Sequence, residues 1–136
     1  MANEFARNLK DEQTTLTRAL TAADGSVTSS DIDLGAYLSG PTLENVELSI
    51  EVPSLTSSEL ASADTLTLTV QGGASASPTT SLNLVKVITG TGSTVAAQEI
   101  RFRLPSDCPR YINVKGTTAG TTGDMSAKSL TIALRY

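Results

Sequence analysis

The sequence predicts an all-β domain built from about eight short antiparallel strands. Apolar and polar residues alternate with a period of two along most of the chain. Gly, Pro, Ser and Asn separate the alternating segments, and no long amphipathic helix pattern follows residue 12. Because each strand has one apolar face, we expect two sheets packed face to face, or a closed barrel. An eight-stranded jelly roll fits the number of strands, and so do other Greek-key sandwiches.

The N-terminal residues are expected to form an arm, 1–12, that precedes a single β-domain, 13–136. Within the arm, 3–11 has the pattern of one or two helical turns, with Phe5 and Leu9 on one face. A helix this short is marginal on its own, so we expect the arm to dock on its own domain or on a neighbour.

The first strands are predicted at 13–20 and 26–34. Between them, Ala-Ala-Asp-Gly at 22–25 predicts a hairpin, because Asp-Gly is a preferred turn dipeptide. The strand at 43–52 shows the clearest alternation. Its expected inward residues are Val46, Leu48, Ile50 and Val52, and its expected outward residues are Glu47, Ser49 and Glu51.

The remaining strands are predicted at 65–71, 82–89, 95–104, 110–115 and 128–136. In the second of these the alternation changes phase near Leu84 and Val85, which a β-bulge or burial on both faces would explain. The third is expected to place Ile100, Phe102 and Leu104 inward and Glu99, Arg101 and Arg103 outward.

Two long connections are predicted, at 53–64 and at 116–124. The second contains no large side chain. Both are expected to be flexible surface loops, or else segments that become ordered against a partner, since binding residues are often placed on loops.

The composition excludes several kinds of chemistry. The 136 residues contain no His, so catalytic triads with His and the common zinc sites are excluded. The one cysteine, Cys108, cannot form an intramolecular disulfide and has no His to activate it as a nucleophile. Asp31 with Asp33, and Glu47 with Glu51, occupy polar strand positions and are interpreted as solvated outer faces. We therefore expect no catalytic residue, no metal and no cofactor.

The charge is unevenly distributed along the chain. The net charge is −4 overall, but it is −8 over 1–85 and +4 over 86–136. The bases in the second part are scattered and lack interleaved aromatic residues, so nucleic-acid binding is not expected. Arg101, Arg103 and Arg110 either receive carboxylates from a second chain or pair within this chain, for instance with Glu47 or Glu51.

No apolar run is long enough for a transmembrane helix, so no membrane partner is expected. The first residues, MANEFARNLKDEQ, are charged where a signal peptide needs an apolar segment. Synthesis in the cytosol is therefore expected, and a single cysteine is consistent with it.

Three stretches support a resemblance to a known family. They are ARNLKDEQTTLTRALTAADGSVTSSDIDLG (6–35), RFRLPSDCPRYI (101–112) and SLTIALRY (129–136). Together with the alternating strands between them, their order resembles the small capsid cement, or decoration, proteins of short-tailed phages of the Bordetella-phage type.

The resemblance implies a β-sandwich of jelly-roll type on the outer surface of an icosahedral phage head, made in the bacterial cytoplasm. Such proteins bind the major capsid protein, bridge its neighbouring subunits and pair with copies of themselves, as a homodimer or a trimer. They use no cofactor and catalyse no reaction. The expected contact residues are Phe5, Arg7 and Leu9 of the arm and Arg101, Arg103 and Arg110 of the domain.

Three other functions stay open. A carbohydrate-binding or adhesin-like sandwich would need aromatic faces, but the chain has no Trp and its five aromatic residues are dispersed. An enzyme such as a carboxylate-dependent glycosidase would need a cleft between its acids. Another minor head or tail component of the virion would share the all-β class.

Overall fold

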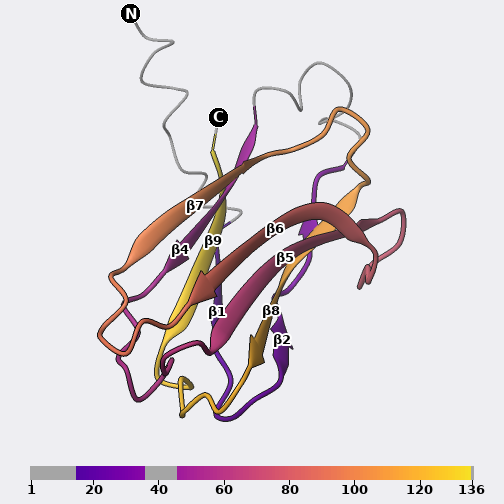
Figure 1. Cartoon of the computed structure of the whole chain (residues 1–136). Helices are drawn as coiled ribbons and strands as arrows, with labels where there is room; N and C mark the ends of the chain where they lie inside the picture. Colours follow the sequence, from indigo (N-terminus) through magenta and orange to yellow (C-terminus); the bar gives the residue numbers. More distant parts are fainter. Residues whose placement is uncertain (1–14, 36–45, 136) are drawn as a thin grey trace, which may run out of the picture.

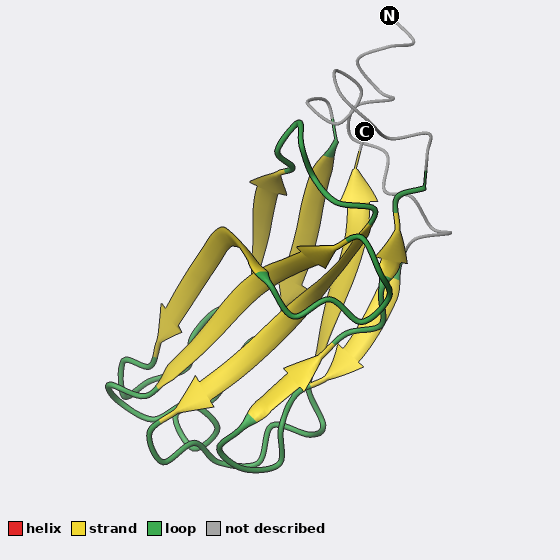
Figure 2. Ribbon diagram, turned by 90° about the vertical axis from the view of Figure 1, so that its right-hand side faces the viewer, coloured by secondary structure: helices red, strands yellow, loops and turns green. Residues whose placement is uncertain are grey.

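The protein is an antiparallel β-sandwich (Figures 1 and 2). The computed structural model describes residues 15–35 and 46–135, and this part contains strands and no helix. The predicted all-β class is therefore confirmed. The predicted arm, with Phe5, Arg7 and Leu9, lies outside the described residues.

Within residues 15–35 and 46–135, nine strands form two sheets. The first sheet has the order β1 (Leu16–Ala19), β9 (Ser129–Arg135), β4 (Glu47–Val52) and β7 (Gln98–Arg103). The second has the order β2 (Ser26–Thr28), β8 (Tyr111–Ala119), β5 (Thr65–Gly73) and β6 (Ser81–Thr89), and β3 (Ile32–Asp33) also pairs with β8. Along the chain the strands therefore cross repeatedly from one sheet to the other.

The core lies between the sheets and is built from the alternating residues. Leu48 and Ile50 of β4 point inward, as do Leu66, Leu68 and Val70 of β5, and all five are fully buried. A fully buried aliphatic side chain of this size contributes about 2 kcal/mol through removal of its surface from water. The period-two pattern that predicted these strands is therefore also the pattern that holds the sheets together.

The predicted hairpin at 22–25 is wrong. β1 pairs with β9 in the first sheet, whereas β2 pairs with β8 in the second, so this turn takes the chain across the sandwich. The single strand predicted at 26–34 is also divided into β2 and β3. At the break, the Ser29 side chain accepts a hydrogen bond from the backbone N–H of Val114. Pairing with distant strands outweighs the local turn signal here.

Both predicted loops need correction. Residues 116–119 belong to β8, because they pair with β5 from Thr65 to Leu68. In the connection 53–64, Leu55 forms an isolated β-bridge with Val95, and Leu55 and Leu60 are fully buried. This connection is therefore anchored in the core and is not a surface loop along its whole length.

The predicted change of phase in the strand at 82–89 is wrong. Leu84, Lys86 and Ile88 lie opposite the inward residues of β5, so the inward positions of β6 keep a period of two. Val85 and Val87 are apolar but lie on the outer face, where they are 48% and 49% exposed, so burial on both faces does not apply either. The pairing of β5 with β6 does shift, but nearer the start of β6, between Val70 and Gln71, where Asn83 on the opposite strand has a φ of 60°.

Candidate functional site

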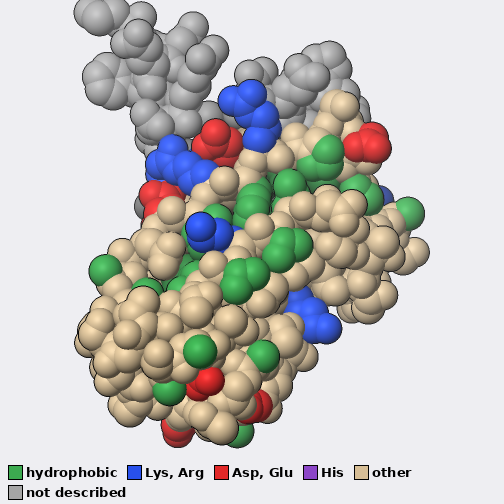
Figure 3. Space-filling model, in the orientation of Figure 1, with side chains coloured by type: hydrophobic (Ala, Val, Ile, Leu, Met, Phe, Trp, Pro, Cys, Tyr) green, Lys and Arg blue, Asp and Glu red, His purple; other side chains and the backbone are tan. Residues whose placement is uncertain are grey.

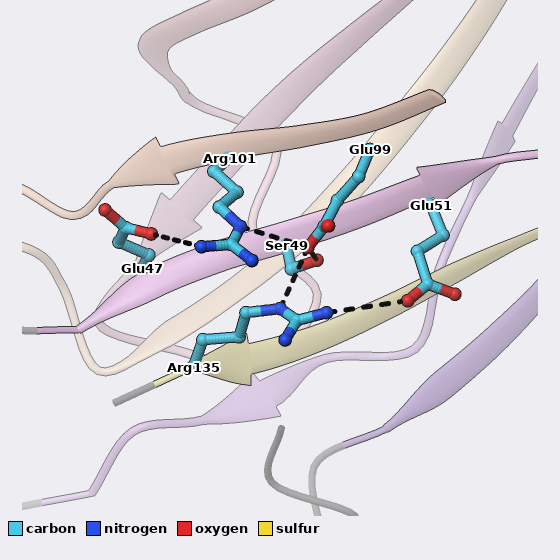
Figure 4. A network of polar contacts seen from close by, with 6 residues as sticks. All are labelled: Glu47, Ser49, Glu51, Glu99, Arg101 and Arg135. Atoms are coloured by element: carbon cyan, nitrogen blue, oxygen red, sulfur yellow. Dashed lines mark hydrogen bonds and ion pairs between the residues drawn. The ribbon is translucent and has the colours of Figure 1, made fainter. Parts of the chain in front are cut away.

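Six polar residues form a connected network on the outer face of the first sheet (Figure 4). We call it the Glu99 network, and it consists of Glu47, Ser49, Glu51, Glu99, Arg101 and Arg135. Three neighbouring strands supply these residues, since β4 lies between β7 and β9. Their outward positions follow from the inward positions of Leu48, Ile50 and Leu134.

Glu99 is the centre of the network. Its Oε1 atom accepts hydrogen bonds from Ser49 Oγ at 2.6 Å and from Arg101 Nε at 3.1 Å. The Nε atom of Arg135 lies 2.9 Å from the same oxygen. At the two ends, Arg101 pairs with Glu47 and Arg135 pairs with Glu51, each at 3.7 Å.

The long side chains of the network cover Ser49 on the outer face of the first sheet. Ser49 is only 1% exposed although it points away from the core, and the side chain of Arg135 is 14% exposed. The Ser49 hydrogen bond is the main reason that the pKa of Glu99 lies below its ordinary value, and Arg101 and Arg135 lower it further. Because each carboxylate of the network already has an internal cation, the network is suited to stabilising the sheet rather than to acid–base chemistry.

We expect protonation of Glu99 to weaken the fold. Its pKa in the folded protein is below the ordinary value of 4.5, so the unfolded chain binds the proton more readily. Stability from this residue is therefore complete above about pH 5 and is lost as the pH falls through the folded-state pKa. Urea unfolding across this range should show a smaller pH slope for Glu99→Gln than for the wild type.

The same variant should lose about 1.5 kcal/mol at pH 7, because buried Ser49 and partly buried Arg135 keep a weaker, uncharged partner. Asp107→Asn is the matched control, since Asp107 is exposed and lies outside the network. An unchanged pH slope in Glu99→Gln would contradict this role for Glu99.

The three predicted contact arginines lie in different surroundings. Arg101 belongs to the Glu99 network. Arg110 forms two hydrogen bonds with Asp33, at 2.8 and 2.9 Å, and its guanidinium lies 5.0 Å from the Tyr111 ring centre. The bond to Arg110 also holds the pKa of Asp33 below its ordinary value. Arg103 is exposed and forms no ion pair with a described residue. Of the two alternatives left open, internal pairing therefore holds for Arg101 and Arg110.

Sequence reasoning did not single out a polar pocket on the second sheet. We call it the Asn113 pocket; it has a volume of about 300 Å³, and its polar lining includes Thr28, Asp31, Gln71, Ser77, Thr79 and Asn113. Asp31 was interpreted as part of a solvated face, but it binds the backbone N–H of Ser77 at 2.6 Å and Asn113 Nδ2 at 3.1 Å. No local pattern indicated this pocket, because three separate segments form it.

The edge of the second sheet is apolar. β6 pairs only with β5 among the described strands, and its outward residues Val85 and Val87 are half-exposed. In Figure 3, hydrophobic side chains form a diagonal row across the face on which β6 lies in front. An exposed edge strand with apolar side chains favours contact with another protein chain.

The described residues offer little support for a reactive cysteine, a metal site or a membrane-spanning helix. Cys108 is half-buried, and burial, with a smaller effect of Asp107, raises its thiol pKa to about 11, so it is a poor nucleophile. No group of three or more His, Cys, Asp or Glu in the described ranges could hold a metal ion. The part of the chain that the structure describes also contains no helix long and apolar enough to cross a membrane.

No known family model matches this chain, and no curated protein sequence is similar to it.

Proposed function

We propose that this chain is a non-enzymatic structural protein of a phage virion. It binds the outside of an icosahedral head after synthesis in the bacterial cytoplasm. There it cements neighbouring subunits of the major capsid protein, and it also pairs with a second copy of itself. The resemblance of 6–35, 101–112 and 129–136 to phage cement proteins suggests this function, and the β-sandwich is compatible with it.

The main structural support is that the two sheets present different contact surfaces. The outer face of the first sheet is charged and includes exposed Arg103 of β7, whereas the second sheet ends in the apolar edge strand β6. Because the outer faces of two packed sheets point in opposite directions, one copy can contact two neighbours at once. A protein that joins subunits needs two such surfaces.

We infer further that the sandwich is of the jelly-roll type. In support, the first strand of each sheet pairs with a strand from near the other end of the chain. These pairs are β1 with β9 and β2 with β8. The β5–β6 pair and the repeated crossings between the sheets are further features expected of two interlocked Greek keys.

The proposed function is tested by locating the chain in purified phage particles. Quantitative mass spectrometry should find it in numbers comparable to the major capsid protein, and cryo-electron microscopy should place it on the outer shell. Presence in only the few copies of a connector or tail component would contradict the proposal in favour of another minor virion component.

We expect Arg103 to contribute to shell binding through charge. Arg103→Glu should weaken binding to heads about tenfold and reduce the dependence of binding on salt, because one complementary charge is reversed. Arg18→Glu is the control, since it makes the same change at an exposed arginine of β1. Equal binding of both variants across salt concentrations would remove Arg103 from the interface. Arg101 is less suitable for this test, because reversing it also breaks the Glu99 network.

We expect the β6 edge to mediate self-pairing. The double variant Val85→Lys and Val87→Lys should weaken self-association at least tenfold, because two half-exposed apolar contacts become charges. Sedimentation equilibrium provides the measurement, and Thr89→Lys at the end of the same strand is the control. A wild-type chain that stays monomeric, or a double variant that associates normally, would contradict this assignment.

A carbohydrate-binding or adhesin-like sandwich is the second candidate, and the Asn113 pocket is the observation in its favour. Its amide and carboxylate groups are of the kind that bind sugar hydroxyls. Binding of the purified chain to a glycan array would favour this candidate.

A further inference from the structure

The Asn113 pocket contains a buried acceptor that binds no described donor. Asn113 is 2% exposed, and its Oδ1 atom has no hydrogen-bond partner within residues 15–35 and 46–135. Its Nδ2 group is already engaged, because it donates to Asp31 Oδ1 at 3.1 Å and to the Pro78 carbonyl at 3.2 Å. These two acceptors fix the orientation of the amide, so the oxygen cannot exchange places with the nitrogen. A buried acceptor left in this state is unfavourable unless a ligand or water supplies a donor.

The sheet explains why this residue lies outside the core and is nevertheless buried. Asn113 lies directly opposite Gln71 in the pairing of β8 with β5, and its neighbours Ile112 and Val114 point into the core. Asn113 and Gln71 therefore point outward. The segment that contains Ser77, Pro78 and Thr79 then folds over them and is held by Asp31, Asn113 and Gln71.

The pocket is rich in acceptors and has a negative charge. Asp31 forms no ion pair with a described residue, and each of its oxygens accepts one hydrogen bond. Gln71 Nε2 donates to the Thr79 carbonyl at 3.0 Å, which leaves the amide oxygen of Gln71 as a further acceptor. None of the residues that line the pocket is basic. A ligand with a positive charge and several hydrogen-bond donors would complement this lining.

An organic cation fits this lining better than a metal ion. Hard cations such as Ca²⁺ prefer several carboxylate oxygens, but Asp31 is the only carboxylate in the lining. Two N–H groups already point at that carboxylate, those of Ser77 and Asn113, and they would lie close to a bound metal. Ammonium and guanidinium groups instead bring donors to a carboxylate and to amide oxygens.

We propose that the Asn113 pocket binds the ammonium or guanidinium end of a lysine or arginine side chain from a partner protein. A volume of about 300 Å³ accommodates such a group with part of its aliphatic stem. The identity of the partner as the major capsid protein rests on the proposed function, whereas the chemistry of the pocket does not. The Asn113 pocket would then act as a socket, meaning a binding site for one lysine or arginine side chain of the major capsid protein.

The chemistry is tested on the isolated chain by nuclear magnetic resonance. Ethylguanidinium and ethylammonium chlorides are the probes, neutral N-ethylurea is the isosteric control, and the signals followed are the Asn113 side-chain amide and the Ser77 N–H. We expect saturable shifts with the cations and at least tenfold weaker binding of N-ethylurea. Asp31→Asn should weaken cation binding about tenfold, whereas Asp107→Asn, an exposed aspartate elsewhere, should not change it.

Thr28→Lys provides a second variant that does not depend on removing Asp31. Thr28 is exposed at the rim of the pocket, so a tethered ammonium should occupy the site, raise the melting temperature and abolish probe binding. Equal binding of N-ethylurea, stronger shifts with CaCl₂ than with either probe, or no shift with any of them would overturn the proposal. The last result would assign the Asn113 oxygen to a bound water.

The partner is tested separately with purified heads. If the wild type binds heads and Asp31→Asn binds them at least tenfold less tightly, the socket is used in assembly. If both bind equally, the socket assignment fails while the proposed function stands. If the wild type does not bind heads, the proposed function fails, and the small-molecule result alone decides the chemistry of the pocket.

Discussion

Replacing Gly90 by alanine will destabilise the protein by about 3 kcal/mol, because its backbone packs directly against another segment. A Cβ atom at this position would overlap the Ala61 carbonyl oxygen and lie 2.7 Å from that of Leu60. Both obstacles are backbone atoms, so the connection 53–64 would have to move. That movement would strain two hydrogen bonds, from Ala63 N–H to the Gly90 carbonyl and from Gly90 N–H to the Asp64 carbonyl.

Urea unfolding of Gly90→Ala measures this loss, and Gly116→Ala is the matched control. Gly116 is also buried in the sandwich, but a Cβ there would meet only side-chain atoms of Leu66, Leu68 and Val27, at 3.6 to 3.7 Å. These are ordinary contact distances, so the control should change stability by less than about 1 kcal/mol. Similar losses for the two variants would show that the backbone contact of Gly90 has no special weight.

Replacing Leu60 by alanine will also cost about 3 kcal/mol, although Leu60 lies in a connection between strands. Its side chain is fully buried and belongs to the same core cluster as Leu66 and Ile88. The loss combines the transfer of buried carbon to water with the cavity left behind. Leu84→Ala on half-buried β6 is the control and should lose about half as much. A loss below about 1 kcal/mol for Leu60→Ala would mean that the connection moves away from the core at little cost.

The strands could be predicted because burial follows a period of two wherever one face meets the core. The strand predicted at 43–52 shows this in its described part, β4, since Leu48 and Ile50 are buried as the alternation requires. The partner of each strand could not be predicted, because it depends on contacts between residues far apart in the chain. The Asp-Gly turn at 22–25 shows the limit: its local preference is real, but β1 and β2 find partners in different sheets.

The surface features were less accessible to sequence reasoning. Alternation placed Arg101 and Arg103 outward. It did not show that Arg101 pairs with Glu47 and Glu99, whereas Arg103 forms no ion pair with a described residue. Ser49 was expected on a solvated face, yet long side chains from β7 and β9 cover it. Asn113 showed no signal, because its burial arises only when the segment around Pro78 folds over β8.

The place of β9 in the first sheet has a consequence for how the protein is made. β9 lies between β1 and β4, so the sheet cannot join its earliest strand to the rest until residue 135 has been synthesised. A ribosome-bound chain therefore exposes two apolar strand edges during translation, and such edges are prone to aggregation. Folding should therefore be a late event that waits for β9, and contacts between distant residues should slow it. The amount of folded protein in the cell would then depend on how quickly chains that contain β9 close the sandwich.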